Sequence, residues 1–433
     1  MKYIYRVFPL FLSLIVTFVF YPGMMSYDTL HALRSARNGV TDSMWPPMVS
    51  YVWRFVDLVS TNPSAMHFFQ VAILMYSVFF IFKLLTKKAN YSVLFLTMYL
   101  GIPVIFGTVV VIWKDVLMAS FFLAGFVLMI YMKQIVKGYW LYLLGFVTLV
   151  LVFLGTCSRH NAITGAVPLL FYLAYVVCAR FSMRALYLWL GVFAIGSVLT
   201  GGVFKAKTAL DNFSLPHFET LANSSGTFIQ VVQILDLAGA SLCVGENQFG
   251  VLAPHLSIAD IEKAYDPRHI NLSKGLLDQV STTEDVGKVW LTTAVNHPVC
   301  ILNNKYLLTK FMVGANDGGQ FIITHPSVDE NEYGYALQKS DLRELGFRYI
   351  IGASQFSIFR PWFLYFITCI LFVFILVKKT FIVEQIVLFF SGMFYLGGLI
   401  LFGNAADARL LFYTTTVFFI VTCFSLFDFN RSK

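Results

Sequence analysis

The sequence predicts an all-α polytopic membrane protein with about ten transmembrane helices and a mixed, mainly helical domain outside the membrane. Of its 433 residues, 58% are hydrophobic and only 12% are charged, and the mean hydropathy is +0.73. Soluble domains carry about 25% charged residues, so this composition excludes a water-soluble globule. Long uncharged runs supply the helices, because a transmembrane helix needs about 20 apolar residues.

Ten uncharged runs predict the spans, and they fall into two groups. Seven lie in the region 1–204 and three in the region 361–433, which also includes a short cytoplasmic tail. Each run approaches the length that a helix needs to cross the hydrocarbon layer. The predicted helices cover residues 7–22, 66–85, 91–112, 116–132, 139–156, 162–178, 185–204, 361–377, 381–402 and 410–427.

Lysine and arginine in the short connecting segments predict the orientation of the chain. They gather in alternate segments, and the positive-inside rule places such segments in the cytoplasm. Both termini are therefore expected to be cytoplasmic, and most of the formal charge of +8 reflects topology rather than affinity for nucleic acid. The cations concerned are Lys2, Arg6, Lys83, Lys87, Lys88, Lys133, Lys137, Arg180, Arg184, Lys378, Lys379, Arg431 and Lys433.

Residues 205–360 have a different composition and predict a folded extracytoplasmic domain. This region holds 12 Lys and Arg against 16 Asp and Glu, and Pro, Gly and Asn interrupt it as they do in soluble folds. Cys243 and Cys300 both fall here, and the sequence leaves open whether they pair, because separation along the chain does not give a Cα distance. Apolar spacing predicts helices at 228–242, 258–265 and 286–295.

The first outer loop, residues 23–65, contains the most informative charge. Ser26 is a suitable N-cap, Asp28 falls in the first turn of the helix that follows, and Gly39 suits the end of that helix. The N-terminus of a helix favours an ionised aspartate. A purely structural role, in which Asp28 only stabilises the helix, is the alternative to a catalytic one.

Trp45-Pro46-Pro47 separates that helix from a second one in the same loop. Five apolar residues after the prolines share one helical face. This pattern predicts an amphipathic helix that lies along the membrane surface. The five residues are Val49, Val52, Trp53, Val56 and Val59.

Three short outer turns add charges close to the membrane surface. Lys114 and Asp115 lie in one turn, Arg159 and His160 in another, and Arg409 follows the last. Lysine and arginine bind phosphate, and arginine does so through two hydrogen bonds. Pairing with nearby acids or with lipid headgroups is the alternative role. No ionisable side chain lies in the middle of a predicted span, where coupled transporters usually place one.

Together these motifs resemble the GT-C glycosyltransferases, which are polytopic enzymes that use polyprenyl-linked sugar donors. In size and layout the chain is most similar to the bacterial and prophage serotype-converting O-antigen glucosyltransferases. The resemblance implies an inverting transfer of a sugar such as glucose to a surface glycan such as the O-antigen of lipopolysaccharide, at the outer face of the bacterial cytoplasmic membrane. The motifs are Tyr27-Asp28, Trp45-Pro46-Pro47, Trp113-Lys114-Asp115, Arg159-His160-Asn161, the late outer domain and the arginine before the final helix.

The resemblance makes Asp28 the catalytic base. Trp45 stands where relatives usually have a histidine, and Asp115 would supply the second carboxylate that many relatives carry beside the first. These departures disfavour a divalent cation, so no metal or other cofactor is expected. The residues predicted for donor phosphate and substrate are Lys114, Asp115, Arg159, His160, Arg409 and Trp45.

The implied partners are the polyprenyl-phosphate sugar, a glycan acceptor, membrane lipid and the enzymes that supply and flip the lipid-linked sugar. In the outer domain, Trp290, His297 and Tyr306 are candidates for contacting the acceptor. Two alternatives remain open. An O-antigen polymerase or ligase would depend on arginine and histidine of the long outer segment more than on Asp28, and a flippase or transporter would move its substrate without changing a covalent bond.

Overall fold

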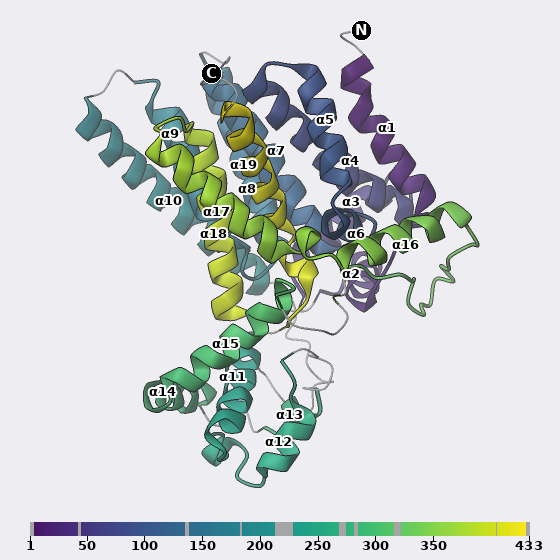
Figure 1. The fold of residues 1–433 in the computed structure, drawn as a ribbon, viewed down its shortest axis with the longest axis vertical. Coiled ribbons are helices and arrows are strands. Elements are labelled where there is room, and N and C mark those ends of the chain that lie inside the picture. Colours follow the sequence, from purple (N-terminus) through teal and green to yellow (C-terminus); the bar gives the residue numbers. More distant parts are fainter. Residues whose placement is uncertain are drawn as a thin grey trace.

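The computed structural model describes residues 4–41, 45–134, 138–181, 184–212, 228–267, 274–280, 285–315, 321, 323–403 and 405–429. Within these ranges every regular element is a helix, and the β pairing consists of two isolated bridges. The predicted all-α class is therefore confirmed for the described residues. Figure 1 shows a bundle of long helices, a smaller helical unit beyond one end of it, and both chain termini at the other end.

Six helices of the described part are long and apolar enough to cross a membrane. A seventh crossing arises if the bent pair α5 (Ala89–Leu100) and α6 (Pro103–Val109) forms one span. This is the make-up of a membrane-embedded protein. The six are α4 (Pro63–Thr86), α7 (Lys114–Gln134), α8 (Trp140–Cys157), α10 (Ala185–Asn212), α18 (Val383–Phe402) and α19 (Phe412–Phe429) with the preceding 3₁₀ turn η4 (Ala408–Leu411).

Three further predicted spans are apolar helices of 16 or 17 residues, α1 (Ile4–Val19), α9 (Ala162–Cys178) and α17 (Pro361–Val377). At 1.5 Å per residue, such helices are shorter than a hydrocarbon layer of about 30 Å. Helices are thus confirmed at these positions, while membrane crossing is supported by length and composition only for the six or seven above. Four of the cations used to predict orientation, Lys2, Lys137, Arg431 and Lys433, lie outside the described residues.

The prediction of one helix over 91–112 is wrong. Helix α5 ends at Leu100, and α6 begins at Pro103 with its axis turned by 82°. Proline disfavours helical geometry in the residue before it, and Ile102 is accordingly extended, with φ −84° and ψ 117°. Mean hydropathy does not register this break, because Gly101, Ile102 and Pro103 are all uncharged.

Residues 228–312 contain the separate helical unit seen at one end of the bundle (Figure 1). Its core includes Leu237, Phe249 and Ile261, which are fully buried. A disulfide between Cys243 and Cys300 joins its first and last helices, which settles the pairing that the sequence left open. The three predicted helices are confirmed. The unit consists of α11 (Phe228–Val244), η1 (Gly250–Leu252), α12 (Ile258–Ala264), α13 (Lys274–Leu277), α14 (Val286–Asn296) and α15 (Pro298–Met312).

The predicted outer domain 205–360 is divided in the structure. Its beginning continues α10 as far as Asn212, and its end, including α16 (Asp341–Ser354) and η3 (Ser357–Phe359), belongs to the bundle. Helix α16 packs on α6, and Gly346 permits a close approach to α1, because a Cβ atom there would lie 2.9 Å from the ring of Phe20. The compact separate unit is therefore α11 to α15.

The first outer loop forms two helices, as predicted. Helix α2 (Tyr27–Asn38) ends at Gly39, which adopts a left-handed φ of +82°. Ser26 occupies the N-cap position, but its side chain makes no capping hydrogen bond. Its Oγ instead accepts a hydrogen bond from Nε1 of Trp113 at 3.0 Å, so this serine ties the start of α2 to the segment before α7.

Helix α3 (Pro47–Asp57) was predicted to lie on the membrane surface, and this placement of its apolar face is wrong. Val49, Val52, Trp53 and Val56 are buried against α2, α4 and α8. Val59 lies beyond the end of the helix and is 87% exposed. The predicted stripe is therefore real, but it packs against protein, because α2 offers an apolar face of its own.

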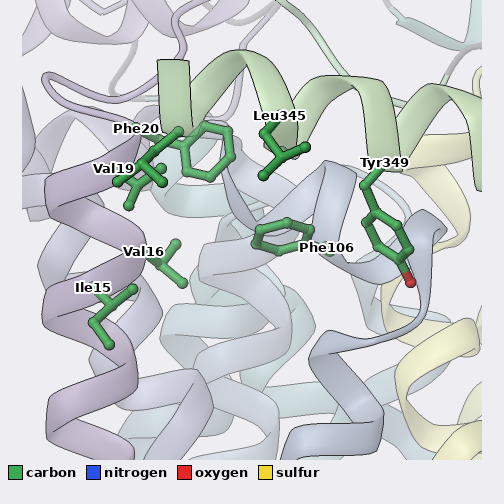
Figure 2. A pocket seen from close by; sticks show the side chains of 9 residues that line it. Ile15, Val16, Val19, Phe20, Phe106, Leu345 and Tyr349 are labelled. Atoms are coloured by element: carbon green, nitrogen blue, oxygen red, sulfur yellow. The ribbon is translucent and has the colours of Figure 1, made fainter. Parts of the chain in front are cut away.

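An apolar cavity of about 230 Å³ lies beneath α16, between it and the outer ends of α1 and α6 (Figure 2). Val16, Phe20, Phe106, Leu345 and Tyr349 are among its lining residues. None of the described residues that were predicted for the functional site lines it.

Candidate functional site

Four segments that were predicted as outer loops or turns meet at one end of the bundle. They are the first predicted outer loop and the turns that contain Lys114, Arg159 and Arg409. Met24, which follows α1, donates its backbone N–H to the carbonyl of Val110 at 3.3 Å. The backbone carbonyl of Met24 accepts a hydrogen bond from the backbone N–H of Ile112 at 3.0 Å. Thr29 of α2 donates its hydroxyl to the backbone carbonyl of Ile112 at 2.8 Å. The α8–α9 turn and η4 reach this end through the charged contacts described next.

Asp28, in the first turn of α2, lies at the centre of a charged cluster. One carboxylate oxygen, Oδ2, is 3.0 Å from Nη2 of Arg409 and 3.6 Å from Nζ of Lys114. The other, Oδ1, accepts a hydrogen bond of 3.2 Å from Nε1 of Trp45. Three predicted site residues, Trp45, Lys114 and Arg409, therefore all contact a fourth, Asp28, although 381 positions separate Asp28 from Arg409.

Arg409 is held by two further residues to which no role had been assigned. Its Nε lies 2.7 Å from Oδ2 of Asp407, and its guanidinium is 4.8 Å from the centre of the Trp113 ring. Planar guanidinium groups stack well on aromatic faces. Trp113 also donates to Ser26, as noted above. A tryptophan directly before two charged residues in a short outer turn is the sequence signal that could have identified it.

The Asp28 carboxylate is reachable from solvent but electrostatically satisfied. Asp28 is 24% exposed, Lys114 20% and Arg409 18%, so a ligand can contact this group of three. Burial alone would raise the pKa of the Asp28 carboxyl. The charges of Lys114 and Arg409 and the hydrogen bonds from Trp45 and Arg409 outweigh burial and hold this pKa well below its usual value of 3.8.

Asp115 and Arg159 form a second, buried pair beside this group. Asp115 is 1% exposed and Arg159 is 11% exposed, and Nη1 of Arg159 donates to Oδ1 of Asp115. Arg159 also reaches Oδ1 of Asn161 at 3.4 Å. The structure thus places Asp115 as the partner of Arg159. His160 lies in the turn between α8 and α9.

Trp45 is positioned by an aromatic stack. Its ring lies over the imidazole of His31, with 3.9 Å between the ring centres and 22° between the planes. His31 comes from the next turn of α2 after Asp28, so the stack and the hydrogen bond to Asp28 both join the segment before α3 to α2. Sequence reasoning placed Trp45 in the site but did not identify His31.

A strap formed by residues 325–335 fixes α2 from the outside. The backbone N–H of Met25 donates to Ser327 O at 3.2 Å, and that of Asp329 donates to Met25 O at 3.0 Å. Arg34 of α2 then contacts Glu332 at 3.1 Å. The strap comes from the late outer segment, so this segment contributes to the site by holding the helix that carries Asp28.

The predicted inner cations gather elsewhere in the bundle. Lys133 and Tyr172 both lie 2.7 Å from Oε1 of Glu384, and Arg180 donates to the backbone carbonyl of Lys133 at 3.0 Å. Glu384 is 4% exposed. These residues satisfy one another and are well suited to a structural role.

Of the candidates in the α11–α15 unit, Trp290 takes part in a hydrogen-bond and ion-pair network. Trp290 donates its Nε1 to Asp236 at 3.1 Å, and Asp236 also pairs with Lys305 at 2.8 Å. This network belongs to the interior of the unit, so the indole N–H of Trp290 already has a hydrogen-bond acceptor within the protein. Tyr306 is 61% exposed. Among the described residues, no group of three or more His, Cys, Asp or Glu side chains could hold a metal ion.

Comparisons with protein-family models, with curated proteins and with solved structures gave no match. The functional interpretation therefore depends on the geometry of the charged cluster. One partly exposed carboxylate, with two partly exposed cations on one of its oxygens, can accept a proton from a hydroxyl and can bind a phosphate.

Proposed function

We propose that the protein is an inverting membrane glycosyltransferase. It would transfer a sugar such as glucose from a polyprenyl-phosphate donor to a surface glycan, such as the O-antigen of lipopolysaccharide, on the outer side of the bacterial cytoplasmic membrane. The observation that supports this most is the meeting of Asp28 with Lys114 and Arg409 at one end of the helical bundle. A hydroxyl acceptor and a phosphate leaving group need these two kinds of side chain.

The chemistry requires little more than this set. The phosphate of a polyprenyl donor leaves as an anion, so cations rather than a general acid promote its departure. A single carboxylate then takes the proton of the acceptor hydroxyl during in-line attack on the anomeric carbon, which inverts its configuration. Glycosidases need two carboxylates because their leaving group is a poorer one.

The residues divide into contacting and positioning groups. Asp28 is the base, and Lys114 and Arg409 contact the donor phosphate. Arg159 is tied to buried Asp115, so its positive charge is fixed close to the site while its direct access is limited. Trp45 orients Asp28 through its hydrogen bond. His160 lies in the same turn as Arg159 and is assigned to the substrate.

The cellular arrangement follows from the same proposal. Both termini and the Lys133 end of the bundle would face the cytoplasm, and the Asp28 end and the α11–α15 unit would face outward. A lipid-linked sugar is too polar to cross the bilayer unaided. Partner enzymes would therefore attach the sugar to the lipid and flip the product before this protein uses it.

Replacing Asp28 tests the proposal directly. In Asp28→Asn we expect no transfer of sugar to surface polysaccharide, because the amide cannot accept the proton. Mass spectrometry and linkage analysis of polysaccharide from cells with and without the variant measure this. Asp57→Asn is the matched control, since Asp57 also pairs with an arginine of α2, Arg37, but at 3.5 Å and outside the cluster.

The outcomes separate this function from its rivals. Full transfer by Asp28→Asn protein that is folded and membrane-inserted would remove Asp28 from the reaction. A polysaccharide whose chain length alone changes would favour a polymerase or ligase. Surface sugar composition that is the same with and without the wild-type gene would argue for movement of lipid-linked substrate without chemistry.

A further inference from the structure

Each cation of the charged cluster is paired with a carboxylate of the same cluster. Its three carboxylates belong to Asp28, Asp115 and Asp407. Lys114 contacts Asp28, Arg159 contacts Asp115, and Arg409 contacts both Asp28 and Asp407. The formal charge of the cluster is therefore zero. A phosphate that enters such a site must take cations from carboxylates that already hold them, and the exposures given above make Lys114 and Arg409 the ones that it can reach.

We propose that the phosphate of the donor and the carboxylate of Asp28 compete for Lys114 and Arg409, so that donor binding frees Asp28 Oδ2 to accept the proton of the acceptor. In the empty site the two cations mask the base. This inference rests on the proposed function and adds to it an order of events, in which the donor must bind before the acceptor hydroxyl can be activated.

The geometry assigns different roles to the two oxygens of Asp28. Oδ1 is held by the indole N–H of Trp45, whose ring is fixed on His31. Oδ2 is held by the two cations. Because both cations approach the carboxylate at Oδ2, a shift of both toward a phosphate releases this oxygen and leaves the carboxylate oriented by Trp45.

Electrostatics acts in the same direction. With the pKa of Asp28 held low, the carboxylate in the empty site is a weak base. A phosphate on the same cations brings a like charge close to Asp28, and a like charge raises the pKa of a carboxyl. The charged or titratable groups that adjoin it are Lys114 at the start of α7, Arg409 and Asp407 at η4, Tyr27 and His31 of α2, and the Arg159–Asp115 pair.

The reaction step then balances. The acceptor hydroxyl gives its proton to Asp28 Oδ2 as its oxygen forms a bond to the anomeric carbon. The bond from that carbon to the phosphate oxygen breaks, and its electron pair leaves with the polyprenyl phosphate, whose charge Lys114 and Arg409 neutralise. The proton passes from Asp28 to water after the products leave, and the cations return to Asp28.

A binding experiment tests the competition without requiring sugar transfer. Dodecyl phosphate is titrated calorimetrically into detergent-solubilised full-length wild type, Asp28→Asn and the control Asp57→Asn. Removing the competing carboxylate should tighten binding by about tenfold in Asp28→Asn, the lower end of what a neighbouring charge does to an ionic equilibrium. Asp57→Asn should bind as the wild type does. Equal or weaker binding in folded Asp28→Asn overturns the inference.

A second variant localises the effect. In Lys114→Ala, dodecyl phosphate should bind more weakly than in wild type, and adding Asp28→Asn should tighten its binding less than it does when Lys114 is present. Full additivity of the two changes would contradict a shared cation. If Asp28→Asn does not fold, Asp28→Ser removes the same charge with a smaller side chain.

Wild-type kinetics provide a test that needs no variant. The acid limb of kcat reports the donor-loaded enzyme, and that of kcat/KM for the donor reports the free enzyme. The limb of kcat should lie at higher pH, and coincident limbs would overturn the inference. Failure of the proposed function gives a different result: Asp28→Asn tightens phosphate binding, but the wild type transfers no sugar. If Asp28→Asn abolishes transfer and leaves phosphate binding unchanged, only the inferred competition for the cations is contradicted.

Discussion

Asp28 shows how two neighbouring cations set the properties of one carboxylate. Its pKa in the folded protein lies below its usual value, because Lys114 and Arg409 outweigh the effect of burial. A carboxyl with a lowered folded-state pKa stabilises the fold at pH values above its unfolded pKa of about 3.9, and this contribution is lost as the pH falls through the folded value. The ionised form therefore dominates in the empty site throughout the neutral range.

We predict that Asp28→Asn lowers thermal stability by the same amount from pH 8 to about pH 5, well above the unfolded pKa. The difference from wild type should shrink below about pH 4, where protonation removes the charge that the variant lacks. Thermal unfolding in detergent over this range measures it. A difference that grows as the medium becomes acidic would contradict the sign of the pKa shift.

At the scale of single residues, the sequence predicted which residues lie in the cluster but not which acid pairs with which base. Asp28, Lys114, Arg409 and Trp45 were predicted for one site, and the structure brings them together. Asp115 was predicted to supply a second carboxylate, and the sequence did not show that it pairs with Arg159. Which acid pairs with which base depends on distances between helix ends, and the spacing of charges along the chain does not contain those distances.

Among the elements, the α11–α15 unit depends on its disulfide. A unit this small has a limited apolar core, and removing a native disulfide from a small extracellular domain typically costs about 2–5 kcal/mol. We predict that changing both Cys243 and Cys300 to serine makes residues 228–312 much more sensitive to limited proteolysis, while the bundle stays intact.

The control for this prediction is Cys369→Ser, which changes a free cysteine in α17. That variant should be digested in the unit at the wild-type rate. If the double serine variant is digested no faster than the control, the disulfide is not what maintains the unit.

Helix positions were predictable, whereas breaks and helix packing were not. Apolar runs located the long helices, since burial in hydrocarbon requires them. The turn at Gly101-Ile102-Pro103 was not predicted, because a hydropathy average treats these residues as ordinary members of a span. The apolar face of α3 was identified correctly, but a stripe of valines does not distinguish lipid from the side of another helix.

For the molecule as a whole, the proposed orientation leads to a labelling prediction. In a variant whose four free cysteines are serine, Glu330→Cys should react with an impermeant maleimide in sealed cells, because Glu330 lies in the exposed outer strap. Thr380→Cys, in the connection between α17 and α18, should react only after lysis. The opposite pattern would invert the topology and place the Asp28 cluster in the cytoplasm.

The two-part organisation was predictable only in outline. A charged stretch between two apolar regions indicated an outer segment, and part of it does form a separate unit. The sequence could not show that residues 321–360 return to the bundle, because α16 has the mixed composition of a surface helix. Its close approach to the end of α1 depends on the small size of Gly346, and its close approach to α6 on that of Gly107, where a Cβ atom would lie 2.9 Å from Ile350.

The long sequence distance between Asp28 and Arg409 determines when the cluster can form during synthesis of the chain. During synthesis the helix that carries Asp28 emerges early, whereas its strap and its arginine are made near the end. Until the last helix is inserted, Asp28 has Lys114 as its one basic contact from the cluster. A chain that lacks Arg409 thus lacks the completed cluster, which forms only once the residues of η4 reach Asp28.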